Sequence, residues 1–518
     1  MSDPIETITA FEALDSRGRP TVGCTVVTRG GARGRAIVPS GASTGSHEAR
    51  ELRDGGERYG GYGVRRAVAN VEGELLRAVR GIDVTDQEAV DRALRKADGT
   101  QDGGRLGANA ILAISVATAQ AAAAGRGLPL YAAVGDGPRT LPMPMINIIS
   151  GGAHAARALD VQDFLVVPVG ATTFAEAIET VARVRAATGE VLRDRGATWA
   201  LVADEGGYGP QLSSNREALE VLSVAFERAG LIPGDDIAIA IDVAATQFHS
   251  PSEGTYVWET ENRRMQADEL VEELAAWSAD FPIVSIEDAL AEDDWDGWRT
   301  ATDRLGGIQL LGDDLFVTSP DRLRRGIDDA VANAVLVKPN QIGTLSEARE
   351  VVEIAHVAGY ATVLSARSGE TEDHWLADLA IGWNTGQLKI GSTMRSERTA
   401  KMEPSARDRA RTRRRHRAGP SKIRERVLTW RQSSSRTSRG RVPRSRPNWR
   451  TPPAMRSSWR SPTNICSLSP RRRMPSSPVS VASPRRSSMP PSAASRSRAT
   501  GWASTTSMST ARPISASS

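Results

Sequence analysis

Short apolar runs recur along the second third of the chain, and each ends at or just before a charged residue. The runs cover residues 237–241, 283–286, 308–311, 334–337, 361–364 and 386–388. Such short runs of Ile, Val, Leu and Ala are typical of buried strands, most clearly in the first four. Stretches with amphipathic helical spacing, such as 173–194 and 214–229, alternate with strand-like runs in this part of the chain. The alternation predicts a strand-and-helix fold from about residue 136 to residue 401.

Six charged residues follow these runs in order. They are Asp242, Glu287, Asp313, Lys338, Arg367 and Lys389. Successive members are 45, 26, 25, 29 and 22 positions apart, which is about the room that a strand, a loop and a return helix occupy in an α/β barrel. Because the C-terminal ends of barrel strands meet at one face, we expect these side chains to converge on a single mouth.

The first 135 residues have a different pattern. A strand-like run at 21–27 precedes helical stretches at 64–80 and 86–96, which together indicate an α+β domain. The most apolar segment, 108–125, is alanine-rich and interrupted by Asn109 and Gln120, so it predicts a buried helix and no membrane span.

Charge divides the chain at its last quarter. Residues 402–518 hold 27 Lys and Arg but only three acids, Glu403, Asp408 and Glu425; the whole chain carries +4, so residues 1–401 carry −20. The tail is rich in Arg, Ser and Pro and lacks a sustained apolar period, so we expect it to be disordered. Its abrupt start resembles translation in the wrong reading frame, the alternative being an evolved basic tail.

We therefore predict three parts, which are an α+β capping domain at 1–135, a barrel carrying the active site at 136–401, and a basic tail at 402–518. The basic run 411–417 is more typical of a solvated tail than of a nucleic-acid contact, so nucleic acid is not an expected partner. Two distant cysteines, Cys24 and Cys466, give no disulfide framework and no metal-ligand spacing. The lack of a disulfide framework, together with an acidic N-terminus in place of a signal peptide, favours a cytoplasmic protein that does not bind membranes.

Three of the six charged residues, Asp242, Glu287 and Asp313, are hard oxygen ligands of the kind that Mg²⁺ prefers. Each alone would more often be a solvated acid at the start of a loop, but three that each follow an apolar run favour a metal site. Lys338 would lie beside that cation. Burial and a neighbouring cation lower an ammonium pKa toward the range of a general base. A base beside Mg²⁺ suggests removal of the proton next to a carboxylate.

Longer motifs make the chain resemble the enolase family from near the N-terminus to about Lys401. The matching stretches are 15–18, 38–45, 106–112, 285–288, 338–344, 367–373 and 395–398. The resemblance covers roughly three quarters of the chain. It implies a (β/α)8-like barrel of the enolase type with an N-terminal α+β capping domain, and a Mg²⁺-dependent carbon–oxygen lyase of glycolysis, the phosphopyruvate hydratase type. The use of a Lys base with Mg²⁺ by the enolase superfamily is an established example of this chemistry.

Carried over residue by residue, the resemblance implies two Mg²⁺ ions per site. Asp242, Glu287 and Asp313 would hold the first ion, and Ser43 on a loop would help to hold the second with the substrate phosphate. Lys338 is implied as the base and Glu205 as the acid that assists loss of the hydroxyl, with Asp163 paired to it. The implied substrate-binding residues are His154, Gln162, Arg367, Ser368 and Lys389.

Three positions depart from the family pattern. Ala366 stands where enolases carry a histidine before the Arg-Ser pair, Arg157 adds a cation to the histidine loop, and Asp163 stands in place of a glutamate. Three changes around one pocket favour altered substrate recognition. They leave open a specialised paralogue that resembles the carboxyphosphonoenolpyruvate synthases of phosphinate-antibiotic biosynthesis.

The first expectation is dehydration of 2-phosphoglycerate or a close analogue to an enolpyruvate phosphate, so the expected partner is a phosphorylated hydroxy acid. The paralogue is the alternative, and an inactive scaffold with a nucleic-acid-binding tail is a second one. The resemblance also implies a homodimer.

Overall fold

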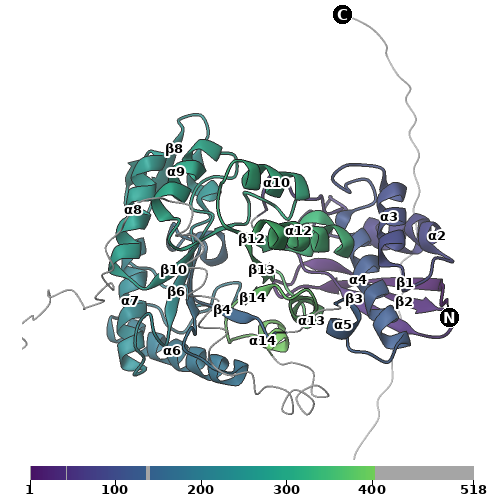
Figure 1. The fold of residues 1–518 in the computed structure, drawn as a ribbon, viewed down its shortest axis with the longest axis horizontal. Helices are drawn as coiled ribbons and strands as arrows, with labels where there is room; N and C mark the ends of the chain where they lie inside the picture. Colours follow the sequence, from purple (N-terminus) through teal and green to yellow (C-terminus); the bar gives the residue numbers. More distant parts are fainter. Residues whose placement is uncertain (1, 43, 136–139, 403–518) are drawn as a thin grey trace, which may run out of the picture. The chain divides into compact units, whose positions relative to one another are not determined.

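The computed structural model describes residues 2–42, 44–135 and 140–402 (Figure 1). Within these ranges the chain forms an N-terminal sheet with helices, followed by a closed barrel of eight strands surrounded by helices. The predicted fold class is thereby confirmed. Apart from Met402, the basic tail lies outside the described residues, and the three domain limits stay predictions.

The N-terminal sheet is antiparallel in the order β1-β2-β3. Its strands are β1 Ile5–Leu14, β2 Pro20–Thr28 and β3 Arg33–Ile37. The helical elements that follow are η1 Arg58–Gly61, α1 Arg65–Asn70, η2 Val71–Leu75, α2 Leu76–Val79, α3 Gln87–Asp98, α4 Ala108–Gly125 and α5 Leu130–Ala133. Gly34 lets β3 approach α4 closely, because a Cβ there would lie 2.0 Å from the carbonyl oxygen of Ala117.

Helix α4 is long and apolar enough to cross a membrane by length and composition, the one such helix among the described residues. However, 78% of it is buried inside the fold, where it packs on β2, β3 and α3. It is therefore the buried core helix that its alanine-rich sequence predicts.

The barrel strands close in the order β10-β11-β12-β13-β14-β4-β5-β6. Their bounds are β4 Met143–Ser150, β5 Asp163–Val167, β6 Ala238–Asp242, β10 Ile283–Glu287, β11 Gln309–Gly312, β12 Ala334–Val337, β13 Ala361–Ser365 and β14 Gly386–Lys389. The strands β6, β11 and β12 are buried throughout, as their continuous apolar runs predict.

Helices cover the outside of the barrel (Figure 1). They are α6 Phe174–Asp194, α7 Asn215–Arg228, α8 Ala267–Asp280, α9 Trp295–Leu305, α10 Pro320–Asp328, α12 Leu345–Ala358, α13 Trp375–Gly382 and α14 Ser396–Met402. Short elements complete the set, namely η3 Gly152–Ala155, η4 Ala245–Phe248, α11 Pro339–Ile342 and the small sheet of β7 His249–Ser250, β8 Thr255–Trp258 and β9 Arg263–Met265. Several helices begin at Ser or Thr caps; Thr173, Ser214 and Thr344 each accept a bond from a backbone N–H of the first turn.

One strand breaks the regular barrel pattern. β5 runs antiparallel to both of its neighbours, β4 and β6, whereas the other neighbouring pairs of barrel strands are parallel. Consequently β5 begins at the face where the other strands end. Its first residue, Asp163, pairs with Ser150 at the end of β4 and with Asp242 at the end of β6.

The N-terminal domain closes against this same face of the barrel. Ser40 and Gly369 exchange backbone hydrogen bonds of 2.8 and 2.9 Å, and the Ala49 N–H donates to the carbonyl oxygen of Gln341 at 2.7 Å. Gly369 permits the contact, because a Cβ there would lie 2.2 Å from a carboxylate oxygen of Asp15. The motifs at 15–18 and 38–45 are thus placed beside the barrel mouth.

Candidate functional site

The six charged residues predicted from the apolar runs lie at one end of the barrel. Asp242, Glu287 and Lys389 are the last residues of β6, β10 and β14, while Asp313 and Lys338 directly follow β11 and β12. Arg367 comes two residues after β13. All six are buried. Because burial of unpaired charge is costly, the arrangement requires partners of opposite sign.

Two lysines supply most of that pairing. The Lys389 ammonium donates to Asp242 at 2.7 Å and to both carboxylate oxygens of Glu287 at 2.8 Å. Lys338 donates to Asp313. Burial, together with the charge of Asp242, still raises the pKa of Glu287 well above its usual range, although Lys389 opposes this. The three carboxylates outnumber the two lysines that pair with them.

Burial and the neighbouring carboxylate of Asp313 act on the pKa of Lys338 in opposite directions. Burial lowers it, but the carboxylate of Asp313 outweighs burial, and the net effect raises the pKa above that of an ordinary lysine. The lowered pKa was predicted for a lysine beside a bound cation, so it stays a prediction for the metal-loaded site.

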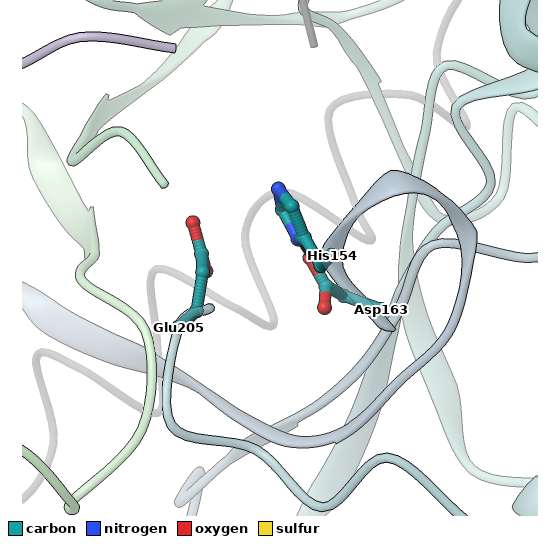
Figure 2. A group of neighbouring side chains, drawn as sticks. All are labelled: His154, Asp163 and Glu205. Atoms are coloured by element: carbon teal, nitrogen blue, oxygen red, sulfur yellow. Dashed lines mark hydrogen bonds and ion pairs between the residues drawn. The ribbon is translucent and has the colours of Figure 1, made fainter. Parts of the chain in front are cut away.

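A second group joins His154 from η3, Asp163 from β5 and Glu205 from the loop before α7 (Figure 2). His154 Nδ1 lies 2.8 Å from Asp163 Oδ2, and one oxygen of Glu205 is buried without a hydrogen-bond partner. Burial disfavours the imidazolium, but Asp163 and Glu205 outweigh burial and raise the pKa of His154 to about 9. Burial raises the pKa of Asp163, whereas for Glu205 the cations of His154 and Arg398 overcome burial and lower the pKa. Environments that separate the pKa values of neighbouring acids are typical of acid–base sites.

Asp163 is held on its other side by strand β4. Its Oδ1 accepts from the Ser150 hydroxyl at 2.9 Å and from the side-chain amide of Asn147. These two donors fix the carboxylate with Oδ2 toward His154. Both carboxylate oxygens of Asp163 are thus engaged by neighbouring side chains.

Arg367 and Ser368 face the N-terminal domain. Both guanidinium nitrogens of Arg367 donate to the carboxylate of Glu48, at 3.0 and 3.1 Å, and the Ser368 hydroxyl accepts from the Ala42 N–H at 2.6 Å and from Arg17 at 3.2 Å. Sequence reasoning missed Glu48, because an acid in a glycine-rich loop gives no sign of a buried partner more than three hundred positions away.

This pairing gives a first testable prediction. Glu48 neutralises the cation that would bind an anionic substrate, so Glu48→Gln should strengthen anion binding, lowering KM for a phosphorylated substrate about three- to tenfold. Steady-state kinetics at fixed ionic strength measure it. Glu88→Gln, which changes an exposed acid on α3, is the matched control, and an unchanged KM in Glu48→Gln would contradict the prediction.

The other residues singled out from the sequence are Gln162, Ser43, Ala366 and Arg157. The Gln162 amide donates at 3.0 Å to Asp242, one of the carboxylates that Lys389 also contacts. Ser43 lies outside the described residues. Ala366 is buried, and its N–H donates to the Lys389 carbonyl oxygen at 2.8 Å. The Arg157 side chain is 63% exposed and lies 4.0 Å from Glu259.

The charge and chemistry of the mouth fit a divalent cation. Asp242, Glu287 and Asp313 offer carboxylate oxygens alone, the donors that Mg²⁺ prefers, and these three acids are paired with only two lysines among the described residues. Asp313 also belongs, with Asp288 and Asp314, to a buried group whose oxygens lie within 4.8 Å of one another. Asp288 already accepts from the N–H groups of Asp313 and Asp314, at 2.9 and 2.8 Å, and so orients this loop.

Comparison with known proteins agrees with this geometry. Residues 5–134 match the family model of the enolase N-terminal domain, and residues 138–408 match that of the enolase C-terminal TIM barrel domain. The chain is 54% identical over 393 residues to an enolase from Rubrobacter xylanophilus, a match that covers 75% of this chain and 91% of that protein.

Proposed function

Since the chain belongs to the enolase family and is an enolase, a carbon–oxygen lyase of glycolysis that dehydrates 2-phosphoglycerate, we propose specific roles for its buried charged residues. Lys338 removes the proton beside the substrate carboxylate. Glu205, on a different segment, assists departure of the hydroxyl group. The observation that carries this assignment is the pair of buried groups, one of lysines with carboxylates and one of His154 with two acids.

The enolase family uses Mg²⁺, and we propose two ions per site. Asp242, Glu287 and Asp313 would hold the first, while Ser43 would help to hold the second together with the substrate phosphate. Bound Mg²⁺ supplies positive charge that stabilises the anion formed when the proton leaves. Lys389, whose ammonium contacts two of these carboxylates, is suited to receive the substrate carboxylate at the same place.

Where the barrel mouth faces the N-terminal domain, Arg367 and Ser368 would bind the substrate phosphate. Glu48 would then be released from the Arg367 guanidinium. His154 and Gln162 would contact the substrate beside Glu205. Asp163, fixed by Asn147 and Ser150, would keep His154 oriented. The substrate would thus lie between a base that follows β12 and an acid in the loop before α7, which favours removal of proton and hydroxyl from opposite sides.

The other candidate functions have less support. The similarity to a curated enolase gives no support to a role in antibiotic biosynthesis. A scaffold without activity would not need the buried charges to be kept together. We also propose a cytoplasmic homodimer. Trp199, Leu201 and Met394 are exposed apolar side chains that suit a contact between subunits.

Incubation of the full chain with 2-phosphoglycerate and Mg²⁺ tests the proposal. Phosphoenolpyruvate should form, detected by its ultraviolet absorbance; EDTA should abolish the reaction, and added Mg²⁺ should restore it. Exchange of the α-proton in deuterated water is followed in parallel by NMR. Absence of both product and exchange would rule out the assigned roles, whereas exchange without product would point to a different substrate.

A further inference from the structure

The motif Arg395-Ser396-Glu397-Arg398 has no role in the chemistry assigned above, although its last residue lies deep in the protein. Arg398, on α14, is fully buried and is among the largest side chains with no exposure. A buried guanidinium is costly unless its donors find partners. The groups that the Arg398 guanidinium contacts therefore indicate which parts of the fold it holds in place.

Arg398 first holds the loop that follows β13. One terminal nitrogen donates to the carbonyl oxygen of Arg367 at 2.7 Å, and the other donates to that of Ser368 at 2.6 Å. The planar fork of an arginine suits two adjacent carbonyls, whereas a lysine ammonium has a single nitrogen. The two residues proposed to bind phosphate are thus fixed through their backbone.

The same guanidinium also reaches the segment of the general acid. It lies 3.4 Å from the carbonyl oxygen of Asp204 and 4.0 Å from a carboxylate oxygen of Glu205. Gly391 makes this approach possible: its φ is +80°, and a Cβ there would lie 2.9 Å from Arg398 Cδ and 2.8 Å from the Glu205 carbonyl oxygen.

Two neighbouring cations, Lys401 on α14 and Arg395 directly before it, contact parts of the same region. Lys401 donates to the carbonyl oxygen of Thr371 at 2.7 Å and pairs with Glu370 at 2.9 Å, so it holds the far side of the β13 loop. Arg395 donates to the carbonyl oxygen of Asp204 at 3.2 Å and also contacts Ser16. Of these three cations, Arg398 contacts both the β13 loop and the Glu205 segment.

We propose that Arg398 is a positioning residue that sets the distance between the phosphate-binding pair Arg367–Ser368 and the acid Glu205. This inference rests on the roles proposed above for those three residues. Because Lys338 is anchored by Asp313 and not by Arg398, loss of the guanidinium should affect phosphate binding and hydroxyl departure more than proton removal.

Kinetics of Arg398→Gln, Arg398→Lys and Arg395→Gln test it, using the full chain with 2-phosphoglycerate and Mg²⁺. For each variant, kcat and KM of dehydration are compared with the rate of α-proton exchange at saturating substrate. Arg398→Gln should raise KM about tenfold and lower kcat about 100-fold, while exchange falls less than about threefold. Arg398→Lys keeps the charge and should raise KM with a smaller loss of kcat. Arg395→Gln removes contacts to the carbonyl oxygens of Asp204 and Ser16 but none to those of Arg367 or Ser368, so it should lower kcat with KM unchanged.

Two results would overturn the inference. The first is a fall in the rate of dehydration in Arg398→Gln that is matched by an equal fall in the rate of α-proton exchange, as a smaller folded fraction would produce. The second is an unchanged KM in both Arg398 variants. If Arg398→Gln does not fold, Arg398→Lys decides through its KM and its ratio of exchange to dehydration. An unmodified chain without either reaction would instead overturn the proposed function, and this inference with it.

Discussion

Lys338→Ala should abolish dehydration of 2-phosphoglycerate, with a fall in kcat on the order of 10⁴-fold, and should abolish α-proton exchange as well. The side chain is buried and held by Asp313, so no nearby group can take its place without moving. A lysine is required there because an arginine does not lose its proton in proteins. Product formation and exchange in deuterated water are measured on the same sample.

The chain offers a sharp control for this substitution. Lysine is rare in it; the described residues contain four, at positions 96, 338, 389 and 401. Lys96 is exposed on α3, away from the barrel mouth, so Lys96→Ala should leave both rates unchanged. Exchange that continues in Lys338→Ala would assign the base to another residue.

Lys389→Met should have the second largest effect, on stability as well as on activity. The change removes the one cation that bonds both Asp242 and Glu287, and leaves two buried carboxylates without it. Breaking a buried ion pair from one side costs about 3–5 kcal/mol in free energy of unfolding. Denaturant unfolding in EDTA measures this loss, and the activity should be lost because the proposed partner of the substrate carboxylate is gone.

Magnesium should restore part of that stability. In the unmodified protein a divalent cation competes with the Lys389 ammonium for the same oxygens, whereas in Lys389→Met it meets unopposed carboxylates. The stabilisation by Mg²⁺ should therefore be larger in the variant than in the unmodified chain. Equal stabilisation in both would show that the ion does not bind at Asp242 and Glu287. Lys96→Met serves as the control for the loss of a lysine.

The sequence predicted the barrel and its mouth because both follow from local pattern. An apolar run of four or five residues needs burial, and a charge directly after it must lie at the strand end, as Asp242 and Glu287 do. Strand direction is not contained in such a run. The residues of β5 would look alike in either direction, so its reversal between β4 and β6 could not be predicted from periodicity.

Contacts between residues of the N-terminal domain and residues of the barrel also could not be predicted from local sequence patterns. Glu48 and Arg367 meet because the N-terminal loops close on the barrel. The positive φ angles of Ala156 and Arg157, at 52° and 58°, also give no signal in a local sequence pattern. The motif around Arg398 was visible in the sequence, but its role depends on carbonyl groups that only the folded loops bring together. Resemblance could identify such residues without giving a physical reason for them.

The closure of the barrel has a consequence for synthesis of the protein. β4 and β5 are joined by a short connection and can pair as soon as both have left the ribosome, but β4 also needs β14, whose Gln387 pairs with Met143. The ring of strands therefore stays open through most of translation and closes only after Lys389 has been made. The composition of the chain changes after Lys401, which follows Lys389 in the sequence. Every strand of the ring has therefore been synthesised before the ribosome reaches this change.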